Sequence, residues 1–491
     1  MSLFSVIINA QSIEDALRYA RPEISGTPRY ISMGGAFNAL GGDFSAISVN
    51  PAASGVFVNS EFNVTLNSNN NQISSSYIEN INSIDSENSN INQFGVVLVL
   101  RNTNDGNLSK FSFAYNYQRT HDYENKYRAT GTNDKVGLDN YFLAFANGIQ
   151  FGRIKTYDNE TLSESYEYLG NNFGFPSQQA FLGYQGYVID PFDEIDLNNL
   201  YRSNSNPQKQ AVDHDFFVSN SGYNSKHSFN ISGQFKEKLY LGINLNSHYT
   251  EFKRIDRLTE FNYGSGSNFI STLFENDLNS IGSGFSFQIG AIYKLEYFRV
   301  GLSYQSPVWY NLTDELFQYL ETSKINGIDI VDPRVINIYE YNLKTPSILS
   351  VGLARVFGSK GLITLQYDYT DLTNLKFNVG DGDRNFINQN NTIERSLKSA
   401  GTLKLGGEYR LSRLSFRAGY HNQQSINKKI NDKNQGFSFG LGYDLGGSLL
   451  NLGILNQKIE RAELMYQEGL NQTINLENIQ TQFCIGLTIK L

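Results

Sequence analysis

The chain has 491 residues, including 31 Tyr, 34 Phe, 43 Gly and only 9 Pro, and its formal net charge is -8. An acidic chain without any block of Lys and Arg is not a nucleic-acid-binding protein. The single cysteine, Cys484, excludes an intramolecular disulfide and a CxxC metal or redox site. Many aromatic residues and glycines with little proline indicate β-strands joined by polar turns.

Residues 1–11 contain a short apolar core, Leu3 to Ile8, followed by the small residue Ala10. This pattern is typical of the end of a secretory signal, although the basic residues that usually precede the core are missing. A buried first strand is the alternative interpretation. We expect residues 1–11 to be a signal-peptide remnant and the protein to be exported.

Residues 12–58 differ from the rest of the chain because they are rich in Gly, Ala and small polar residues. Small residues allow close approach of backbone segments. The segment therefore predicts a compact plug rather than part of a sheet.

From about residue 59 the pattern changes to a strict alternation of apolar and polar residues, which indicates β-strands. With its flanks, each run is about 9 to 12 residues long, which is the length that a tilted strand needs to cross a bilayer. Tyrosines recur at the ends of runs, where an aromatic girdle would lie. Clear runs begin at Phe62, Phe94, Phe111, Phe229, Leu239, Phe285, Val300, Ile363, Leu403, Leu414, Phe437 and Phe483.

Connections between the runs are of two kinds. Short turns occupy residues 236–238, 358–361 and 411–413. The connections over residues of about 155–210 and 308–335 are instead long and polar. Short connections at one end and long ones at the other are typical of a transmembrane barrel, and we expect the two long segments to be extracellular loops. A soluble β-sandwich or propeller is the alternative, but its strands average about 5 to 6 residues, and no repeat of fixed period is present. We predict an all-β fold: a transmembrane antiparallel β-barrel over residues 59–491, with residues 12–58 in its lumen.

The segment from Gly26 to Ala52 resembles the N-terminal hatch of the FadL/TodX family, the outer-membrane transporters of long-chain fatty acids and other hydrophobic compounds. Two later stretches, 343–354 and 403–420, resemble the family's proline-preceded strand and its late hairpin. The order and spacing of these matches are more specific than any one of them. The residues that match the hatch motif are Gly35, Ala36, Asp43, Asn50, Pro51 and Ala52.

This resemblance implies a barrel of about 14 strands in the outer membrane of a Gram-negative cell, with the hatch plugging the lumen. It also implies capture of hydrophobic small molecules between extracellular loops and their release to the membrane lipids. Release would occur through a lateral opening, where an inward kink breaks strand pairing. The chain is longer than the enterobacterial members and its loops are rich in Asn, so substrate identity does not carry over. The alternative is a FadL-like barrel that acts as an adaptor for another outer-membrane protein in a secretion or surface assembly.

Candidate ligand-binding residues come from the long polar segments. Pro176 can begin a helix, and Phe181 and Tyr184 would then share one apolar face that invites a ligand. Packing of this helix on a neighbouring loop near Trp309 is the alternative interpretation. The candidates for contact with an apolar substrate are Phe175, Phe181, Tyr184 and Trp309.

Arg29, within the matched hatch segment, is the candidate partner for a substrate carboxylate. The alternative is a structural ion pair with Asp43 or Glu23, because a buried charge needs a partner in either case. We expect Asn50 and Pro51 to be buried in the plug, where Asn50 fixes a turn.

No catalytic or metal site is evident, and we expect neither enzymatic activity nor a cofactor. The five histidines are not spaced as metal ligands, and no GxSxG, P-loop or dinucleotide-binding motif occurs.

Overall fold

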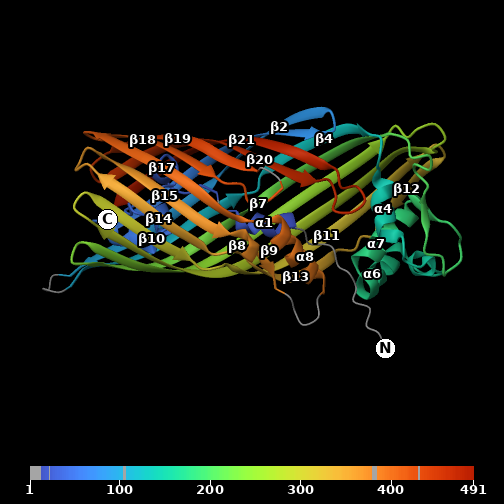
Figure 1. Cartoon of the computed structure of the whole chain (residues 1–491), viewed down its shortest axis with the longest axis horizontal. Helices are drawn as coiled ribbons and strands as arrows, with labels where there is room; N and C mark the ends of the chain where they lie inside the picture. Colours follow the sequence, from blue (N-terminus) through green and yellow to red (C-terminus); the bar gives the residue numbers. More distant parts are fainter. Residues whose placement is uncertain (1–12, 22, 103–106, 379–383, 430–431) are drawn as a thin grey trace.

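The computed structural model describes residues 13–21, 23–102, 107–378, 384–429 and 432–491, so residues 1–11 lie outside the described part. These residues form a closed antiparallel β-barrel of 14 strands around an N-terminal hatch, which confirms the predicted fold class (Figure 1). In order around the wall, the first half consists of β1 (Glu61–Tyr77), β2 (Asn80–Arg101), β3 (Leu108–Asp122) with β4 (Asn125–Asn133), β7 (Val212–Phe235), β8 (Leu239–Phe261), β9 (Phe269–Lys294) and β10 (Phe298–Gln305) with β11 (Trp309–Lys324).

The second half of the wall returns to the first strand. β21 pairs with β1 from Glu61 opposite Lys490 to Ser76 opposite Asn475, and this ladder closes the barrel. The strands of the second half are β13 (Asn337–Lys344) with β14 (Ile348–Val356), β15 (Gly361–Asp371) with β16 (Lys376–Phe377), β17 (Ser399–Leu411), β18 (Leu414–Gln423), β19 (Lys433–Asp444), β20 (Ser448–Leu464) and β21 (Thr473–Lys490).

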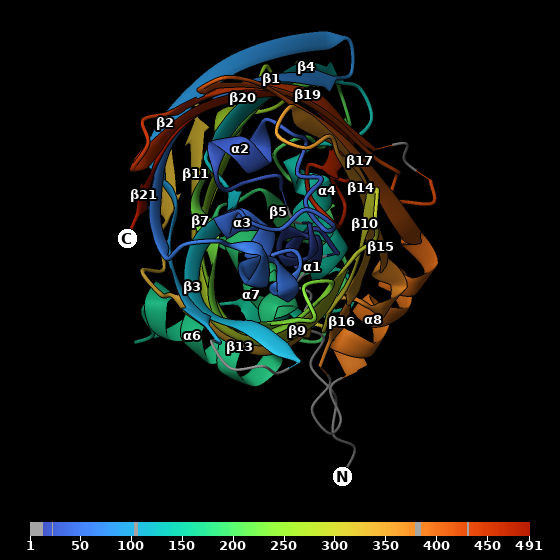
Figure 2. The same ribbon diagram turned by 90° about the vertical axis from the view of Figure 1, so that its left-hand side faces the viewer.

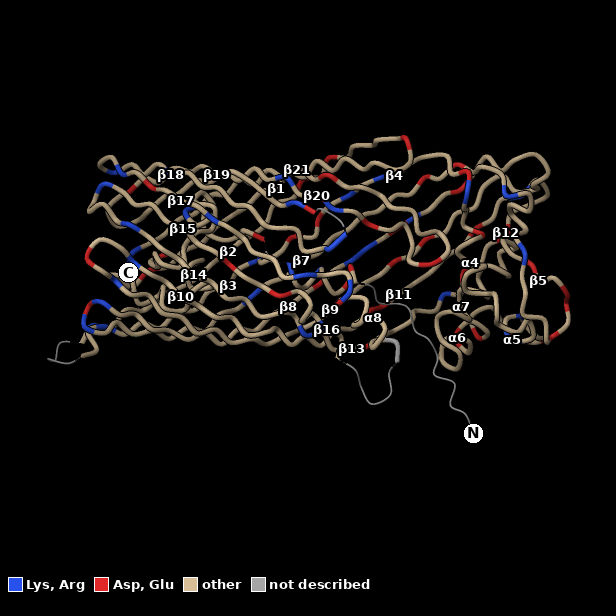
Figure 3. The backbone as a smooth tube through the Cα atoms, in the orientation of Figure 1, with Lys and Arg blue, Asp and Glu red and all other residues tan. Residues whose placement is uncertain are grey.

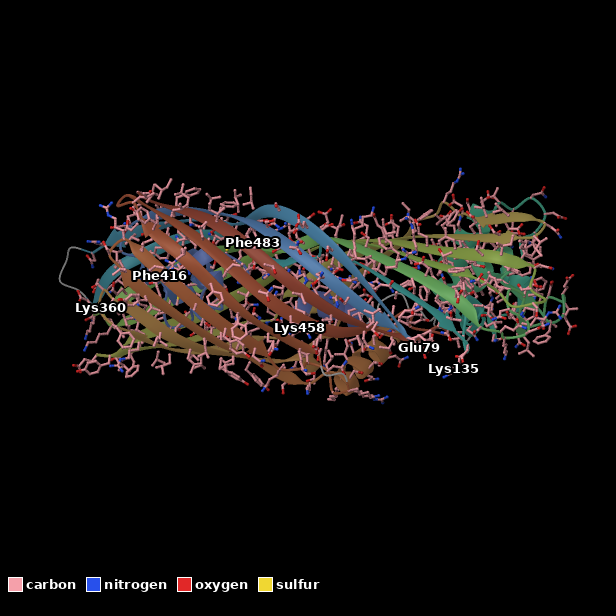
Figure 4. The ribbon with its side chains drawn as sticks, turned by 90° about the horizontal axis from the view of Figure 1, so that it is seen from above. Glu79, Lys135, Lys360, Phe416, Lys458 and Phe483 are labelled. Carbon is pink, nitrogen blue, oxygen red and sulfur yellow. The ribbon has the colours of Figure 1, made fainter. Side chains whose placement is uncertain are left out.

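Alternation along the strands separates an apolar outside from a polar inside. On β19, Phe437 and Phe439 are 60% and 59% exposed, whereas Ser438 between them is fully buried. Phe416 and Phe483 mark the same outer surface in Figure 4. Lys, Arg, Asp and Glu gather at the short turns and in the half of the barrel that bears the helices, and the wall between is mostly free of them (Figure 3). This apolar band is the surface that lipid covers.

Several strands are far longer than a bilayer requires. β7, β8 and β9 have 24, 23 and 26 residues, whereas about 9 to 11 residues cross the apolar core. The surplus forms an extension at the end opposite the short turns, at the right of Figure 1, which helices fill. The elements between β4 and β7 are α4 (Leu138–Ala146), α5 (Phe151–Ile154), α6 (Leu162–Phe173), α7 (Phe175–Gln185), β5 (Ile189–Pro191) and β6 (Tyr201–Ser203).

The prediction of a long loop over residues 308–335 is wrong. This segment forms β11 and β12 (Gly327–Val331), and β11 continues the wall by pairing with β9 and β13. Leu312 and Leu320 face inward and are buried, while polar residues alternate with them on the outside. The polarity arises because the strand leaves the apolar band after Trp309, so the rest of its outer face meets water.

The hatch fills the lumen near the end that bears the short turns. In Figure 2 its helices lie inside the ring of strands. Among the described residues, no helix is long and apolar enough to cross a membrane. The hatch elements are α1 (Ile13–Ala20), α2 (Pro28–Ile31), α3 (Phe44–Ile47) and the 3-10 helix η1 (Pro51–Val56); outside the hatch, α8 (Arg384–Ser396) and the 3-10 helix η2 (Leu372–Asn374) lie between β15 and β17.

A ring of inward-facing glycines, here called the glycine belt, seats the hatch against the wall. A Cβ atom placed on any of them would stand 2.0–2.9 Å from a hatch atom. Four strand pairs carry these glycines directly opposite each other: Gly242 opposite Gly290, Gly301 opposite Gly352, Gly406 opposite Gly419, and Gly440 opposite Gly453. Hatch atoms therefore pack directly against the wall backbone, and at most of these positions the nearest hatch atoms are backbone atoms. The belt comprises Gly95, Gly242, Gly290, Gly301, Gly352, Gly406, Gly419, Gly440, Gly453 and Gly486.

The belt can be tested with two neighbouring glycines on β17. In Gly406→Ala the new Cβ would lie 2.6 Å from the carbonyl oxygen of Met33, whereas in Gly407→Ala the nearest atom is 3.9 Å away. Overpacking typically costs about 1–3 kcal/mol, so Gly406→Ala should loosen the hatch and increase ion leak in planar bilayers. Gly407→Ala should behave like the unaltered protein, and equal leak through both variants would contradict a tightly seated hatch.

Candidate functional site

The hatch motif residues hold the plug together. Asp43 caps α3 by accepting a hydrogen bond from the Ser45 amide at 2.9 Å, and its two oxygens accept from the Thr27 hydroxyl at 2.8 and 2.9 Å. Gly35 has φ of +71°, a left-handed conformation that glycine adopts without strain. The carbonyl of the buried Ala36 accepts from the Thr364 hydroxyl of the wall.

Asn50 fixes the turn into η1, as its type suggested. Its Oδ1 accepts from the Ala52 amide at 3.0 Å, and its Nδ2 donates to the carbonyls of Asn38 and Ala291 at 2.8 and 3.1 Å. Pro51 occupies the first helical position, where the missing donor costs nothing. Asn50 and Ala52 are fully buried, so this triplet ties the plug to strand β9.

Arg29 forms an ion pair with the barrel wall. Its Nε donates to Glu408 Oε2 at 2.8 Å, and its Nη1 donates to the carbonyl of Gly42 at 3.2 Å. Glu408 also pairs with Arg410 and Arg417, so one buried carboxylate joins three guanidinium groups near the end that bears the short turns. The expected ion pair of Arg29 with Asp43 or Glu23 is wrong, because the wall supplies the partner.

The expected exposed face on the loop helix is absent. Phe181 is fully buried and Phe175 is 8% exposed, within the cluster that fills the extension opposite the short turns. Phe181 packs against Tyr166, and Tyr184 packs edge-on against Phe151. Helix α7 is enclosed by α4, α6 and the wall, so these side chains stabilise the extension instead of presenting a capture surface.

Trp309 lies on the wall, not in a loop. It begins β11 opposite Phe285, and the two side chains are 45% and 48% exposed on the outer surface. Both belong to the lipid-facing side, so Trp309 does not join Phe175, Phe181 and Tyr184 at a common site.

A cavity of about 200 Å³, here called the lumen cavity, lies between the hatch and the wall strands. Hatch residues Tyr19, Glu23 and Val49 line one side of it. Its lining is amphipathic: apolar groups alternate with amides and charged groups. Prominent wall residues are Gln118, Lys226, His248, Gln288, Val308, Tyr310, Pro346, Ile348, Asp368, Tyr369, Lys404 and His421.

The wall has a break in main-chain pairing beside this cavity. The β2–β3 ladder ends at Gln93 opposite Gln118, and Asn80–Ile91 of β2 pair with β1 alone. Strand β3 ends at Asp122, and the chain then turns inward into β4. We call the boundary between Asn80–Asn92 and residues 119–133 the seam.

Side chains alone close the seam. Oδ2 of Asp122 accepts hydrogen bonds from the side-chain amides of Asn69, Asn88 and Asn90 at 3.2, 2.8 and 2.9 Å. Farther out, Asn82 Nδ2 donates to the Thr130 hydroxyl at 3.0 Å.

Strand β4 lies beneath the β1–β2 hairpin. Inward-facing Asn71 of β1 donates to the Glu124 carbonyl of the turn into β4 at 3.0 Å. Ser75 likewise reaches the carbonyl of Arg128 on β4. The hairpin therefore covers the outer side of the seam as a flap.

Glu23 connects the hatch to the seam. Its amide donates to the carbonyl of Thr120 at 3.2 Å, its Oε2 accepts from the Asp122 amide at 3.4 Å, and its Oε1 lies 3.4 Å from His121 Nε2. Burial and, after it, the carboxylate of Asp122 raise the pKa of Glu23 from 4.5 to about 8. A gap of about 10 Å³ between the lumen cavity and the seam has room for about one water.

Cofactor and metal sites are not evident in the described part of the chain, where no group of three His, Cys, Asp or Glu is placed to hold a metal ion. Buried Cys484 donates weakly to the carbonyl of Gly453 at 3.4 Å. The site therefore consists of the lumen cavity, the hatch that floors it and the seam beside it.

These features define a plugged transmembrane β-barrel with a weak place in its wall, and the fold is that of the FadL/TodX barrels. It is similar to a FadL homologue of Pseudomonas aeruginosa, with a TM-score of 0.56 at 12% identity over 96% of this chain and 99% of that one. It is also similar to the toluene transporters TodX of Pseudomonas putida (0.51, 13%, 95% and 99%) and TbuX of Ralstonia pickettii (0.50, 12%, 95% and 99%). No protein-family model and no curated protein matches the sequence.

Removing the Asp122 carboxylate should loosen the seam. Asp122→Ala leaves three amide donors without their acceptor, and a hydrogen bond to a charged group is worth roughly 1.5–3 kcal/mol before screening by solvent. Ile24→Cys, behind the seam, should then react several-fold faster with a membrane-soluble maleimide in a Cys484→Ser background. The control is Asp277→Ala, which removes an exposed ion pair with Lys253. Equal labelling rates in both variants would show that the Asp122 hydrogen bonds do not hold the seam closed.

The hatch should loosen as pH rises. A carboxyl whose pKa is raised by burial favours the seated hatch in its neutral form, so this contribution is complete below pH 4.5 and declines until about pH 8. Ion leak should increase between pH 5 and 8 and then level off. In Glu23→Gln the increase should disappear, and an unchanged pH profile in that variant would assign the effect to another group.

Proposed function

We propose that the protein is an outer-membrane transporter for hydrophobic compounds. In this proposal a compound enters from the extracellular end, rests in the lumen cavity and leaves sideways through the seam into the membrane. The observation that carries the proposal is the contrast between the glycine belt and the seam.

An axial route meets the hatch, whose atoms contact the wall at every glycine of the belt. Opening that route would separate many close contacts and the Asn50 and Arg29 hydrogen bonds at once. A lateral route separates only side-chain hydrogen bonds, mainly those to Asp122. The lateral route is therefore the one of lower cost.

Release into lipid also suits the chemistry of the cargo. A buried methylene is worth about 0.8 kcal/mol relative to water, so a hydrophobic molecule gains by passing directly from the lumen into the membrane. Release into the aqueous periplasm would forfeit that gain. A path of modest amphipathic contacts also permits release, because no single contact binds too tightly.

Two of the similar structures are those of toluene transporters, which supports small hydrophobic molecules as the cargo class. Long-chain fatty acids, which the resemblance to the family implies, are part of the same proposal.

An adaptor role is the second candidate. Between β5 and β6 the outer loop exposes Phe192, Ile195, Leu197 and Leu200 by 56–74%. Apolar residues exposed together outside the membrane band favour contact with a partner protein. This surface lies away from the seam, so the two candidates respond differently when the seam is sealed.

Sealing the seam should stop transport. Asn82→Cys with Thr130→Cys, in a Cys484→Ser background, places two thiols across the seam, where the native side chains hydrogen-bond at 3.0 Å. Joining them with a short cleavable thiol crosslinker should reduce uptake of labelled toluene or palmitate at least several-fold in whole cells. A reductant that cleaves the linker should restore uptake.

The control pair is Thr132→Cys with Asp213→Cys, which lie directly opposite each other in the β4–β7 ladder. Linking strands that are already paired should leave uptake unchanged. Full uptake through a sealed seam would remove the lateral route and favour the adaptor role.

A further inference from the structure

The lumen cavity can enclose a small molecule whole, whereas a long acyl chain would have to extend beyond it along the route. Its volume is about 200 Å³, whereas sites for drug-sized ligands typically measure about 300–1,000 Å³. An engineered cavity of about 150 Å³ in another protein holds benzene. The cavity therefore suits a molecule with one ring and a small substituent.

One cation in this cavity has no counter-charge. Lys226 on β7 is 6% exposed, and its Nζ donates to the carbonyl of Ser48 in the hatch at 2.9 Å. Its cross-strand neighbour is His248, whose Nε2 contacts the Ser286 hydroxyl at 2.8 Å. No carboxylate of the described residues lies within ion-pairing distance of Lys226.

The other charged groups that line the cavity have partners. Lys404 pairs with Asp368 at 2.8 Å, and Arg21 pairs with Asp432 at 3.7 Å. Glu23 contacts His121. A buried cation without a counter-ion is unfavourable unless a ligand supplies one, and Lys226 is the group that an anion would satisfy.

Aromatic surface adjoins this cation. The rings of His248 and Tyr310 are 5.9 Å apart between centroids, and those of Tyr310 and Tyr19 are 5.6 Å apart. Val308 and Ile24 add aliphatic surface to the same cavity. A flat ring can lie against these groups while its acidic substituent reaches Lys226.

We propose that the lumen cavity binds a compact aromatic carboxylate, with Lys226 as the cation that selects the acid. This inference rests on the proposed function for the route of the molecule, but binding in the cavity is measurable without transport. Lys226 donates charge-assisted hydrogen bonds to the carboxylate, and these are stronger than bonds between neutral groups. The acid is thereby preferred over a neutral compound of the same size.

The test is binding to the purified full-length barrel in detergent, followed by fluorine NMR. The probes are para-fluorobenzoate and its neutral analogue para-fluorobenzyl alcohol. The unaltered protein should bind the acid more tightly, and Lys226→Gln should weaken acid binding by about tenfold or more while alcohol binding stays the same. Lys226→Arg should restore part of the acid binding.

Lys360→Gln, at the tip of a short turn (Figure 4), is the matched control and should bind both probes normally. Retained resistance to unfolding in detergent confirms that Lys226→Gln is folded. Equal binding of acid and alcohol, or no effect of Lys226→Gln, would overturn the inference. If the acid does not bind while sealing the seam still blocks toluene uptake, only this inference is wrong. If the acid binds but sealing the seam has no effect on uptake, the proposed lateral route is wrong instead.

Discussion

The structure depends on the absence of side chains along one ring of its wall. Where ten strands pass the hatch, each presents a glycine, and hatch atoms, most of them backbone, lie at distances that a single Cβ would close. This contact lets loops with little regular structure behave as a rigid plug. Asn50 and Arg29 then fix its orientation by hydrogen bonds to β9 and β17.

Because the plug is rigid, any opening of the barrel has to occur between strands of the wall. Most neighbouring strands are joined by continuous ladders, which separate only when many main-chain bonds are lost together. Beyond Gln93 the β2–β3 ladder stops, and asparagine side chains on Asp122 take its place. Such bonds can exchange with water one at a time, so this boundary can yield while the rest of the barrel stays closed.

The sequence predicted the barrel and the plug because both depend on local patterns. Alternation identified the apolar outer faces, and the type and spacing of Asn50 and Pro51 predicted the turn that the structure contains. The prediction of a loop over residues 308–335 was wrong, because a strand beyond the membrane band carries polar residues on its outer face and therefore lacks the apolar alternation. Phe181 was misassigned because a helix that is enclosed on all sides can still show an apolar stripe.

The candidate site depended on contacts that no local pattern contains. The partner of Arg29 is Glu408, far away in the sequence, and Asp122 gathers amides from two other strands. Lys226 could have been found, since it continues the inward-facing series of Ser228, Asn230 and Ser232 on β7. Its lack of a counter-charge depends on all the strands around it and is visible only in the assembled lumen.

The close fit of the glycine belt also constrains how the molecule is made. A finished cylinder leaves no clearance through which the hatch could be threaded. The carboxylate of Glu408 would also remain buried among Arg410 and Arg417 without its third partner, Arg29. The wall must therefore curl around a hatch that is already in place. The hatch is then the template on which the wall folds, and hatch and wall enter the membrane together.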